Sequence, residues 1–535
     1  MPECRYPVSR TIFIALLIFL LTPVFVRAQR NVTGHAISII TPNLMKQTIS
    51  YLASDSMKGR ATPSPELDAA GEFIARQFKS FGLQPVKGSY FQELSFCYLD
   101  LGKETFLSVV KGIETRNFKI KDDFIPYEFS GSRPAEGEMV FAGYGITAPE
   151  YHYDDYKDLD VQGKIVAVLR QEPGQTDSTG KLFDGIALTH YSSLKEKQEN
   201  AQAHGAAGIL VMSGPLQYSS LQPTGFAWPS WSKTVSKDAL LMDYCDKPAM
   251  CIPMVQVGES VITELFGRVD SLKRVQQRIE KTMQSHSFAI PNRILALNVS
   301  FTSKPIGGRN VIALLEGSDP ALKNEVIVIG GHYDHIGCMK ERQADSDYIF
   351  NGADDNASGT SGVLAVAKAF ATMVESPRRS VMFIAFAGEE RGLLGSATYV
   401  RKPLWPLEKT VAMLNLDMIG RNNPDSLYII GARQNPGLLK VVRKQNKAIG
   451  FTLVESQNKQ LEGGSDHASF FYQGVPVLFF FTGFHPDYHK VTDQADRIDA
   501  DKAARVARLA FLTAWTVANE NKHYKITGSA DGTGK

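Results

Sequence analysis

Cysteine is scarce in this chain, with 5 among 535 residues, and this scarcity excludes a fold that depends on a disulfide scaffold. An excess of charge of one sign is also lacking, because the formal net charge is only +2. Neither nucleic acid nor an anionic membrane surface is therefore indicated as a partner. With 43% hydrophobic and 21% charged residues, the composition predicts a globular protein of two or three domains held together by burial.

A short apolar run at the N-terminus has the pattern of a targeting segment. Arg5 and Arg10 precede the uncharged stretch 11–26, and Val26-Arg27-Ala28 offers a cleavage site. A single membrane anchor is the alternative, but the run is shorter than the about 20 residues that a bilayer span needs. We expect residues 1–28 to be a signal peptide, and the protein to be periplasmic or extracellular without a stable membrane anchor.

Removal of this segment leaves a neutral chain with few cysteines. Its three arginines and one glutamate account for the net charge of +2. Export permits disulfide bonds, and among the remaining cysteines we predict that Cys245 pairs with Cys251.

The pattern of apolar residues changes along the chain. Spacing of apolar residues predicts an amphipathic helix over 65–81, which ends at Gly82. Short strands, turns and polar loops follow, and include a β-α-β unit made of strand 163–169, helix 193–204 and strand 208–212.

From residue 310 onward, buried strands alternate with helical segments. This alternation predicts an α/β fold with a doubly wound, mostly parallel sheet. The predicted strands are 311–315, 326–329, 381–386, 411–416 and 475–481, and the clearest helix is 359–374. We divide the chain into a signal peptide (1–28), an N-terminal part of a peptidase domain (29–90), an insert with flanking strands (91–288), a peptidase domain (289–523) and a disordered tail (524–535).

Metal-type side chains follow the predicted strands of this second half. Glu389 and Glu390 come at the end of the run 381–388, where two adjacent carboxylates are costly unless cations or protons balance them. His332, Asp417 and His489 each follow another buried run. Because the carboxyl ends of parallel strands converge on one crevice, we expect these side chains to form one metal site.

The donor types indicate which metals would bind. Two histidines with three or four carboxylates and no thiolate suit a pair of zinc-type ions. Asp334 lies on the same side of an extended chain as His332 and could orient its imidazole. Of the adjacent glutamates, one can bind metal while the other takes a proton from water.

At this point the sequence resembles the zinc aminopeptidases of the aminopeptidase S and aminopeptidase Y type, which are dizinc exopeptidases. The segments that carry this resemblance are Gly331-His332-Tyr333-Asp334-His335, Gly352-Ala353-Asp354-Asp355-Asn356-Ala357-Ser358-Gly359, Gly388-Glu389-Glu390, Asn415-Leu416-Asp417-Met418 and Tyr488-His489. The segment 144–149, together with 163–166 and 204–206, resembles the β-rich protease-associated domain that is often inserted in such enzymes.

The resemblance implies a role for each matched residue. One zinc ion would be held by His332, Asp355 and Asp417, and the other by Asp355, Glu390 and His489. Asp355 would bridge the two ions and Glu389 would be the general base, and in enzymes of this kind the peptide bond after the bridging aspartate can be cis. Residues placed near the substrate or behind the ligands are Asp334, Ser465, Asp466, His467 and Tyr488.

The resemblance implies an exported aminopeptidase that removes N-terminal residues from peptides by means of a metal-bridged hydroxide. A carboxypeptidase on the same fold would need a cation for the substrate carboxylate, and Arg391 and Arg421 are available. A glutaminyl cyclase relative would use one zinc ion. An inactive binding protein is the remaining alternative, but such proteins typically lose ligands, and here every ligand position is filled.

Overall fold

The computed structural model describes residues 33–175, 183, 185, 188–224, 241–244, 251–339, 346–455 and 463–526. The predicted signal peptide and Cys245 lie outside this part of the chain. The chain forms two compact units, one from Met1–Ser95 with Gly307–Lys535 and the other from Phe96–Ile306. We predicted an insert over 91–288, whereas the second unit of the structure extends to Ile306.

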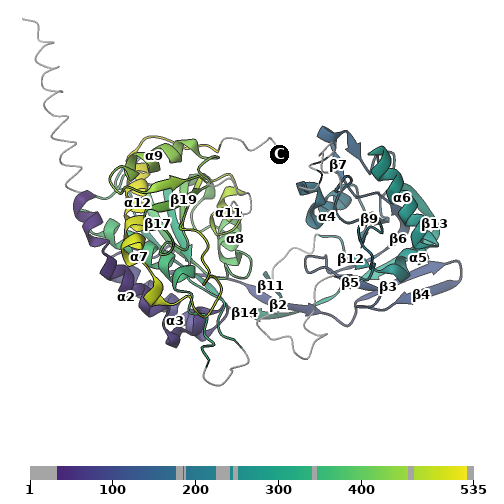
Figure 1. Cartoon of the computed structure of the whole chain (residues 1–535), viewed down its shortest axis with the longest axis horizontal. Coiled ribbons are helices and arrows are strands. Elements are labelled where there is room, and N and C mark those ends of the chain that lie inside the picture. Colours follow the sequence, from purple (N-terminus) through teal and green to yellow (C-terminus); the bar gives the residue numbers. More distant parts are fainter. Residues whose placement is uncertain are drawn as a thin grey trace, which may run out of the picture. The chain divides into compact units, whose positions relative to one another are not determined.

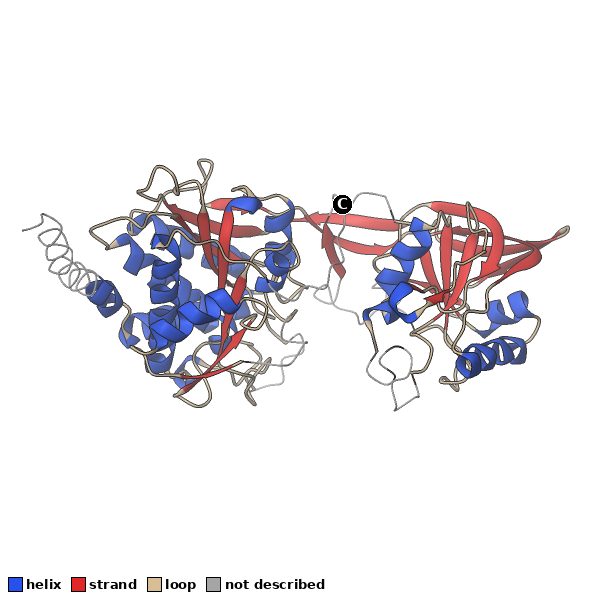
Figure 2. Ribbon diagram, turned by 90° about the horizontal axis from the view of Figure 1, so that it is seen from above, coloured by secondary structure: helices blue, strands red, loops and turns tan. Residues whose placement is uncertain are grey.

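The first unit is built on a mixed eight-stranded sheet with helices on both faces, as Figure 2 shows, and the predicted α/β fold is confirmed. The strand order is β1-β15-β17-β16-β18-β21-β19-β20, in which the four strands from β17 to β21 are parallel. The strands are β1 (Phe91–Glu93), β15 (Arg309–Leu315), β16 (Val326–His332), β17 (Ser380–Phe386), β18 (Thr410–Leu416), β19 (Ser426–Ile430), β20 (Thr452–Val454) and β21 (Val477–Phe481).

Strand register brings the carboxyl ends of the central strands to one edge. His332 at the end of β16 lies opposite Phe386 at the end of β17. Leu416 at the end of β18 lies opposite Phe480 of β21. Residues that directly follow these strands therefore meet above the same edge of the sheet.

Helix α3 shows how the sequence sets the helical layer. Ser64 caps its first turn by accepting a hydrogen bond from the Leu67 amide, and Pro65 occupies the first helical position. Its buried face packs on β15, and Gly82 follows its end with φ at +81°. The helices of this unit are α2 (Pro42–Leu52), α3 (Pro65–Ser80), α7 (Gly359–Ala371), α8 (Leu394–Arg401), α9 (Pro436–Asn446), α11 (His467–Phe471) and α12 (Ala500–Asn519) (Figure 1).

The second unit has its own eight-stranded sheet, with the order β4-β3-β13-β6-β9-β10-β12-β5. The predicted β-α-β unit is present as β9, α4 and β10, with β9 and β10 parallel. The elements of this unit are β2 (Phe96–Leu101), β3 (Phe106–Lys111), β4 (Glu114–Phe118), β5 (Phe124–Pro126), β6 (Pro134–Phe141), β7 (Thr147–Ala148), β8 (Tyr153–Asp154), β9 (Ile165–Leu169), α4 (Leu194–Ala203), β10 (Gly208–Met212), β11 (Leu241–Tyr244), β12 (Met254–Val257), α5 (Glu259–Phe266), α6 (Val269–Thr282), β13 (Phe288–Asn298) and β14 (Phe301–Ile306).

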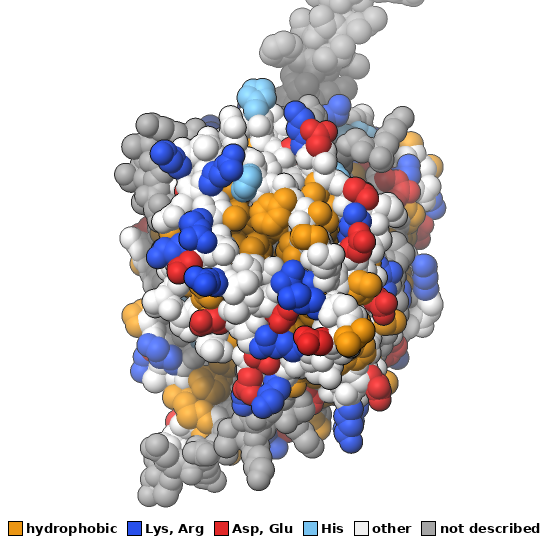
Figure 3. All heavy atoms as spheres, turned by 90° about the vertical axis from the view of Figure 1, so that its right-hand side faces the viewer, with side chains coloured by type: hydrophobic (Ala, Val, Ile, Leu, Met, Phe, Trp, Pro, Cys, Tyr) orange, Lys and Arg blue, Asp and Glu red, His pale blue; other side chains and the backbone are white. Residues whose placement is uncertain are grey.

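The long strand β13 explains why the second unit extends past the predicted boundary. It pairs with β3 on one side and with β6 on the other, and β14 pairs with β2. Figure 3 shows a face of this unit on which acidic and basic side chains are interspersed around hydrophobic ones.

The predicted Cys245–Cys251 disulfide is wrong. Cys251 is an exposed free thiol, whereas Cys97 on β2 is disulfide-bonded. At the C-terminal end, Tyr524 is buried and donates a hydrogen bond to Glu520, and residues 527–535 of the predicted tail lie outside the described part. Within the described ranges, none of the helices combines the length and the apolar character needed to cross a membrane.

Candidate metal centre

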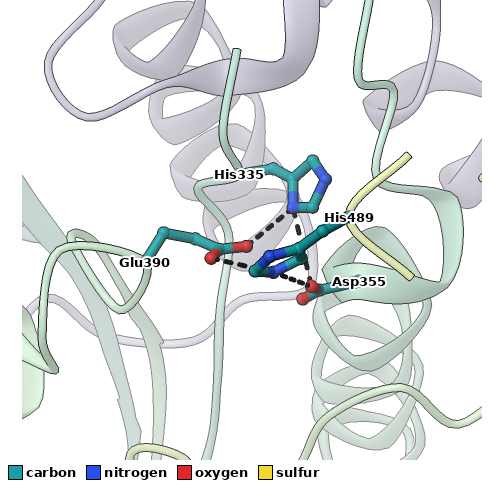
Figure 4. Close-up of side chains that lie close together, drawn as sticks. All are labelled: His335, Asp355, Glu390 and His489. Atoms are coloured by element: carbon teal, nitrogen blue, oxygen red, sulfur yellow. Dashed lines mark hydrogen bonds and ion pairs between the residues drawn. The ribbon is translucent and has the colours of Figure 1, made fainter. Parts of the chain in front are cut away.

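Two groups of metal-type side chains lie above the carboxyl edge of the first unit's sheet, and they have Asp355 in common. The first group is His332, Asp355 and Asp417. The second is His335, Asp355, Glu390 and His489, shown in Figure 4. All five predicted ligands thus meet at one place, although they come from widely separated parts of the chain.

The two carboxylate oxygens of Asp355 face different groups. Oδ1 lies 3.3 Å from Nε2 of His332, whereas Oδ2 lies 3.1 Å from Nε2 of His489. In the first group, His332 Nε2 is also 3.4 Å from Asp417 Oδ1, and in the second His489 Nε2 is 3.1 Å from Glu390 Oε2. These distances suit donor atoms that surround two neighbouring cations with Asp355 between them.

The loop after Gly352 fixes Asp355 in this position. The Asp355–Asn356 peptide bond is cis, as the family resemblance implied. The Asn356 side chain donates to the Leu416 carbonyl at 3.1 Å and accepts from the Gly359 amide at 2.8 Å. The neighbouring Asp354 turns away and accepts a hydrogen bond from the Gly420 amide at 2.7 Å.

Hydrogen bonds from behind orient the ligands of the first group. Ser465 donates to Asp417 Oδ2 at 2.7 Å, which leaves Oδ1 facing His332. His332 Nδ1 lies 3.2 Å from the Asp334 carbonyl oxygen and 3.6 Å from Asp334 Oδ1. Asp334 Oδ1 also accepts the Glu389 amide at 3.2 Å, so Asp334 connects the ligand His332 to the predicted base.

Carboxylate charge at the centre shifts the pKa values of several residues. Burial raises the pKa of Glu389 well above its ordinary range, and Glu390 and Asp417 add to this rise although His332 opposes it. Burial alone would lower the pKa of His332, but the charges of Asp417 and Glu389 raise it well above its ordinary value. Buried negative charge in this amount requires protons or metal cations to balance it.

The remaining predicted residues lie around the same centre. Burial raises the pKa of Asp466 to about 7, although the charge of His332 opposes this rise. The ring of His467 packs against Phe479, with ring centroids 4.7 Å apart. Tyr488 stacks on His489 with centroids 3.9 Å apart.

A small cavity opens onto the first donor group. Its titratable lining residues are His332, Asp355, Glu389 and Asp417. The other lining residues are mostly apolar, namely Met418, Gly464, Phe479, Phe481, Phe484 and Tyr488. Phe479 and Phe481 of β21 line the cavity whereas Phe480 between them does not, because alternate residues of a strand point to opposite faces.

Two residues of the centre were not assigned from the sequence. His335 Nδ1 lies 2.7 Å from Glu390 Oε1, and His335 follows the end of β16, where strand alternation no longer predicts direction. Arg60 is fully buried and donates to the carbonyl oxygens of Tyr333 at 2.9 Å, Asn351 at 2.9 Å and Gly352 at 3.0 Å. It thereby ties the two ligand-bearing loops together, and no sequence pattern indicated this contact.

Asp493 is a third residue without a predicted role. It accepts hydrogen bonds from the backbone amides of Asp354 and Asp355 at 3.0 and 3.1 Å. Since Asp493 and His489 belong to the same segment, these bonds connect the loop that carries His489 to the loop that carries Asp355.

Comparison with known proteins shows which family this region resembles. Residues 310–514 match the model for Peptidase family M28. Leupeptin-inactivating enzyme 1 of Streptomyces exfoliatus is 32% identical over 200 residues, which cover 37% of this chain and 41% of that protein. Aminopeptidase YwaD of Bacillus subtilis is 24% identical over 417 residues, or 75% of this chain and 72% of that protein. The probable glutamate carboxypeptidase AMP1 of Arabidopsis thaliana is 24% identical over 481 residues, which cover 82% of this chain and 61% of that protein.

Coverage differs among these relatives, and the chain spans only about 41% of the first of them. The matched region 310–514 begins on β15 and contains every strand that precedes a predicted ligand. Residues 310–514 are therefore similar to peptidase family M28, and this matched region contains all five predicted ligands.

Proposed function

We propose that this protein is an exported dizinc aminopeptidase that removes N-terminal residues from peptides with a free amino group. The observation that carries the proposal is the pair of donor groups that share Asp355 and open onto an acidic and aromatic cavity. The name of aminopeptidase YwaD agrees with this activity.

The residues present fit two zinc ions. Both groups consist of imidazole nitrogens and carboxylate oxygens, which are zinc donors. Asp417 Oδ1 and His489 Nε2 are buried and have no hydrogen-bond partner within the described part of the chain. The lone pairs of both atoms are therefore available to bind a metal ion. His332, Asp355 and Asp417 would hold one ion, and Asp355, Glu390 and His489 the other.

When bound, the two ions would lower the pKa of a water molecule and polarise the scissile carbonyl. Glu389 lies beside the first group, with Oε2 4.0 Å from His332 Nε2. A carboxylate with a raised pKa at this position can take the proton of water and later give it to the leaving amine. Asp334 contacts both the Glu389 backbone amide and His332, and so fixes the position of the base relative to this ligand.

The cavity favours an amino group over a carboxylate as the recognised end of the substrate. Among the described residues that line it there is no lysine or arginine, whereas three carboxylates are present. Arg421, considered as a carboxylate receptor, already donates to Asp487 at 2.6 Å. Because zinc ions would neutralise their ligands Asp355 and Asp417, the feature that disfavours a terminal carboxylate is the lack of a cationic side chain in the described lining to pair with it.

The carboxypeptidase alternative has one specific point in its favour, the name of the Arabidopsis relative AMP1. A glutaminyl cyclase with one ion would leave the second donor group without a use. We also propose that the second unit is a protease-associated domain with a structural or substrate-gating role, since no metal-type group is found among its described residues.

The proposal is tested by metal quantification combined with a substrate panel. We expect about two zinc ions per chain and hydrolysis of peptides with a free N-terminus, but no hydrolysis of N-acetylated ones. One ion per chain with cyclisation of N-terminal glutamine would favour the cyclase. Cleavage that requires a free C-terminus would favour the carboxypeptidase.

A further inference from the structure

His335 lies in the second donor group although the family resemblance gives it no role. Its imidazole is fully buried, and Nδ1 points toward Glu390 and Asp355 (Figure 4). Nδ1 is 2.7 Å from Glu390 Oε1 and 3.7 Å from Asp355 Oδ2. Its position could make it either a metal ligand or a partner of a ligand.

The distances indicate that His335 is a partner of Glu390. Two ligand atoms of one tetrahedral zinc ion lie roughly 3.3 Å apart, given bonds of about 2.0–2.1 Å. His489 Nε2 lies 3.1 Å from both Glu390 Oε2 and Asp355 Oδ2, which is close to this spacing. The 2.7 Å between His335 Nδ1 and Glu390 Oε1 is instead a hydrogen-bond distance.

Packing holds the imidazole in the orientation that this bond needs. The ring lies against the backbone of Gly352, where an added Cβ would approach ring atoms Cγ and Cδ2 to 2.5 Å. The His335 amide donates to the Arg60 carbonyl at 3.2 Å, which fixes the backbone on the other side. The ring therefore has little freedom to turn away from Glu390.

The hydrogen-bonding needs of the ring determine its tautomer. Nε2 of His335 is buried and has no hydrogen-bond partner in the described part of the structure. A proton on Nδ1 allows donation to Glu390 and leaves only an acceptor unsatisfied. A proton on Nε2 alone would bury an unpaired N–H and would set two lone pairs against each other at Nδ1 and Oε1.

The first donor group contains the same arrangement with a different donor. There Ser465 donates to Asp417 Oδ2, and Oδ1 is left facing His332. In the second group, His335 engages Oε1 of Glu390 and leaves Oε2 facing His489. Asp417 and Glu390, the two predicted ligands that do not bridge the groups, thus each have one oxygen held by a hydrogen bond and the other directed at the centre.

We propose that His335 is a positioning residue whose Nδ1–H bond to Oε1 makes Glu390 a one-oxygen ligand and aims Oε2 at the second metal position. This inference rests on the proposed dizinc function and extends it. The hydrogen-bond donor is an imidazole at one metal position and a hydroxyl at the other, so a change at residue 335 should affect only one of the two ions.

The test is a titration of metal-free protein with Zn²⁺ in the presence of a competing chelator, applied to three variants. His335→Leu removes the donor. His335→Gln places an amide near the position of Nε2, and His335→Asn places one near the position of Nδ1. We expect His335→Leu and His335→Gln to lower the affinity for one of the two zinc ions by about 10- to 100-fold. His335→Asn should restore most of that affinity.

His286→Asn in the second unit is the matched control and should leave both affinities unchanged. The proposal would be overturned if the affinity for both zinc ions fell equally, or if His335→Leu and His335→Gln kept the wild-type affinity. It would also be overturned if His335→Asn did not recover the lost affinity. If His335→Leu does not fold, the comparison of Gln with Asn decides alone. Fewer than two ions in the wild type would instead overturn the dizinc function itself.

Discussion

The two units of this protein both contain parallel strands joined by helices, but they differ in how their buried polar groups are satisfied. In the second unit, the buried Asp155 accepts hydrogen bonds from the Tyr144 amide at 2.9 Å, the Ile146 amide at 3.2 Å and the Tyr153 hydroxyl at 2.9 Å. In the first unit, Asp417 Oδ1 and His489 Nε2 have no such partner among the described residues.

This difference shows where each unit depends on something outside the chain. Internal hydrogen bonds satisfy the buried carboxylate of Asp155, and the buried side-chain atoms of the second unit that lack a partner among its described residues are neutral oxygens such as the hydroxyls of Tyr127 and Tyr156. The first unit has several carboxylates and imidazoles converging at a strand edge, and only cations or protons can balance their charge. A layout of parallel strands is therefore not enough to make a site, because the residues that follow the strands decide whether it binds a ligand.

Removal of metal should produce the largest difference in stability between the two units. Chelation is expected to abolish peptide hydrolysis, with recovery on addition of Zn²⁺. Loss of bound metal should also destabilise the first unit by about 4 kcal/mol at a free metal concentration of roughly 1,000 times Kd, and leave the second unit unchanged. Calorimetry with and without chelator measures this effect, and an equal shift of both transitions would remove the contrast between the units.

Replacement of the predicted base should give the next largest effect. Glu389→Gln is expected to lower kcat/KM by about 10²- to 10⁴-fold with unchanged zinc content, because the amide cannot accept the proton of water. Glu280→Gln in the second unit is the matched control. Glu280 accepts a hydrogen bond from the Gly174 amide at 2.9 Å, so its change should affect stability and leave kcat/KM unaltered. Near wild-type turnover in Glu389→Gln would refute the assigned role.

The cavity of the first unit should select the first residue of the substrate. Since Phe479, Phe481 and Met418 line it beside three carboxylates, peptides with N-terminal leucine or phenylalanine should be preferred over those with glutamate. We expect a ratio of kcat/KM of about 10- to 200-fold, measured with dipeptide amides. A preference for N-terminal glutamate would show that another surface binds this side chain.

The last effect that we predict concerns the second unit alone and should leave hydrolysis unchanged. Lys197 is buried, and burial lowers its pKa to about 7 although the charges of Asp155 and Glu172 oppose this. Between pH 7 and about 10 the unfolded lysine binds more protons than the folded one, so stability should rise with pH, by up to about 1.4 kcal/mol per pH unit. Lys197→Met should remove this rise, which denaturant titrations at several pH values can measure while hydrolysis at pH 7 stays normal.

Much of the first unit could be predicted from the sequence because its strands are buried on both faces. Continuous apolar runs such as 381–386 and 411–416 correspond to β17 and β18, and the helix predicted over 65–81 is α3. The gathering of His332, Asp417 and Glu390 followed from their positions directly after such runs.

Features that depend on distant pairing could not be read in the same way. The end of the second unit at Ile306 depends on β13 and β14, whose partners lie more than a hundred residues earlier. The disulfide prediction was wrong because two cysteines close in sequence gave no information about Cys97. His335 was missed because it lies beyond the strand end, where neither strand nor helix periodicity assigns a direction.

Arg60 has a consequence for the order in which parts of the first unit can be completed. The ribosome synthesises this residue early, but the carbonyl groups of Tyr333, Asn351 and Gly352 that receive its hydrogen bonds emerge only after the whole second unit. Arg60 can therefore hold the loops that bear the predicted ligands only after the second unit has been synthesised. A fragment that begins at residue 310 would contain the matched peptidase region. It would lack Arg60, whose guanidinium donates hydrogen bonds to the carbonyl groups of those loops.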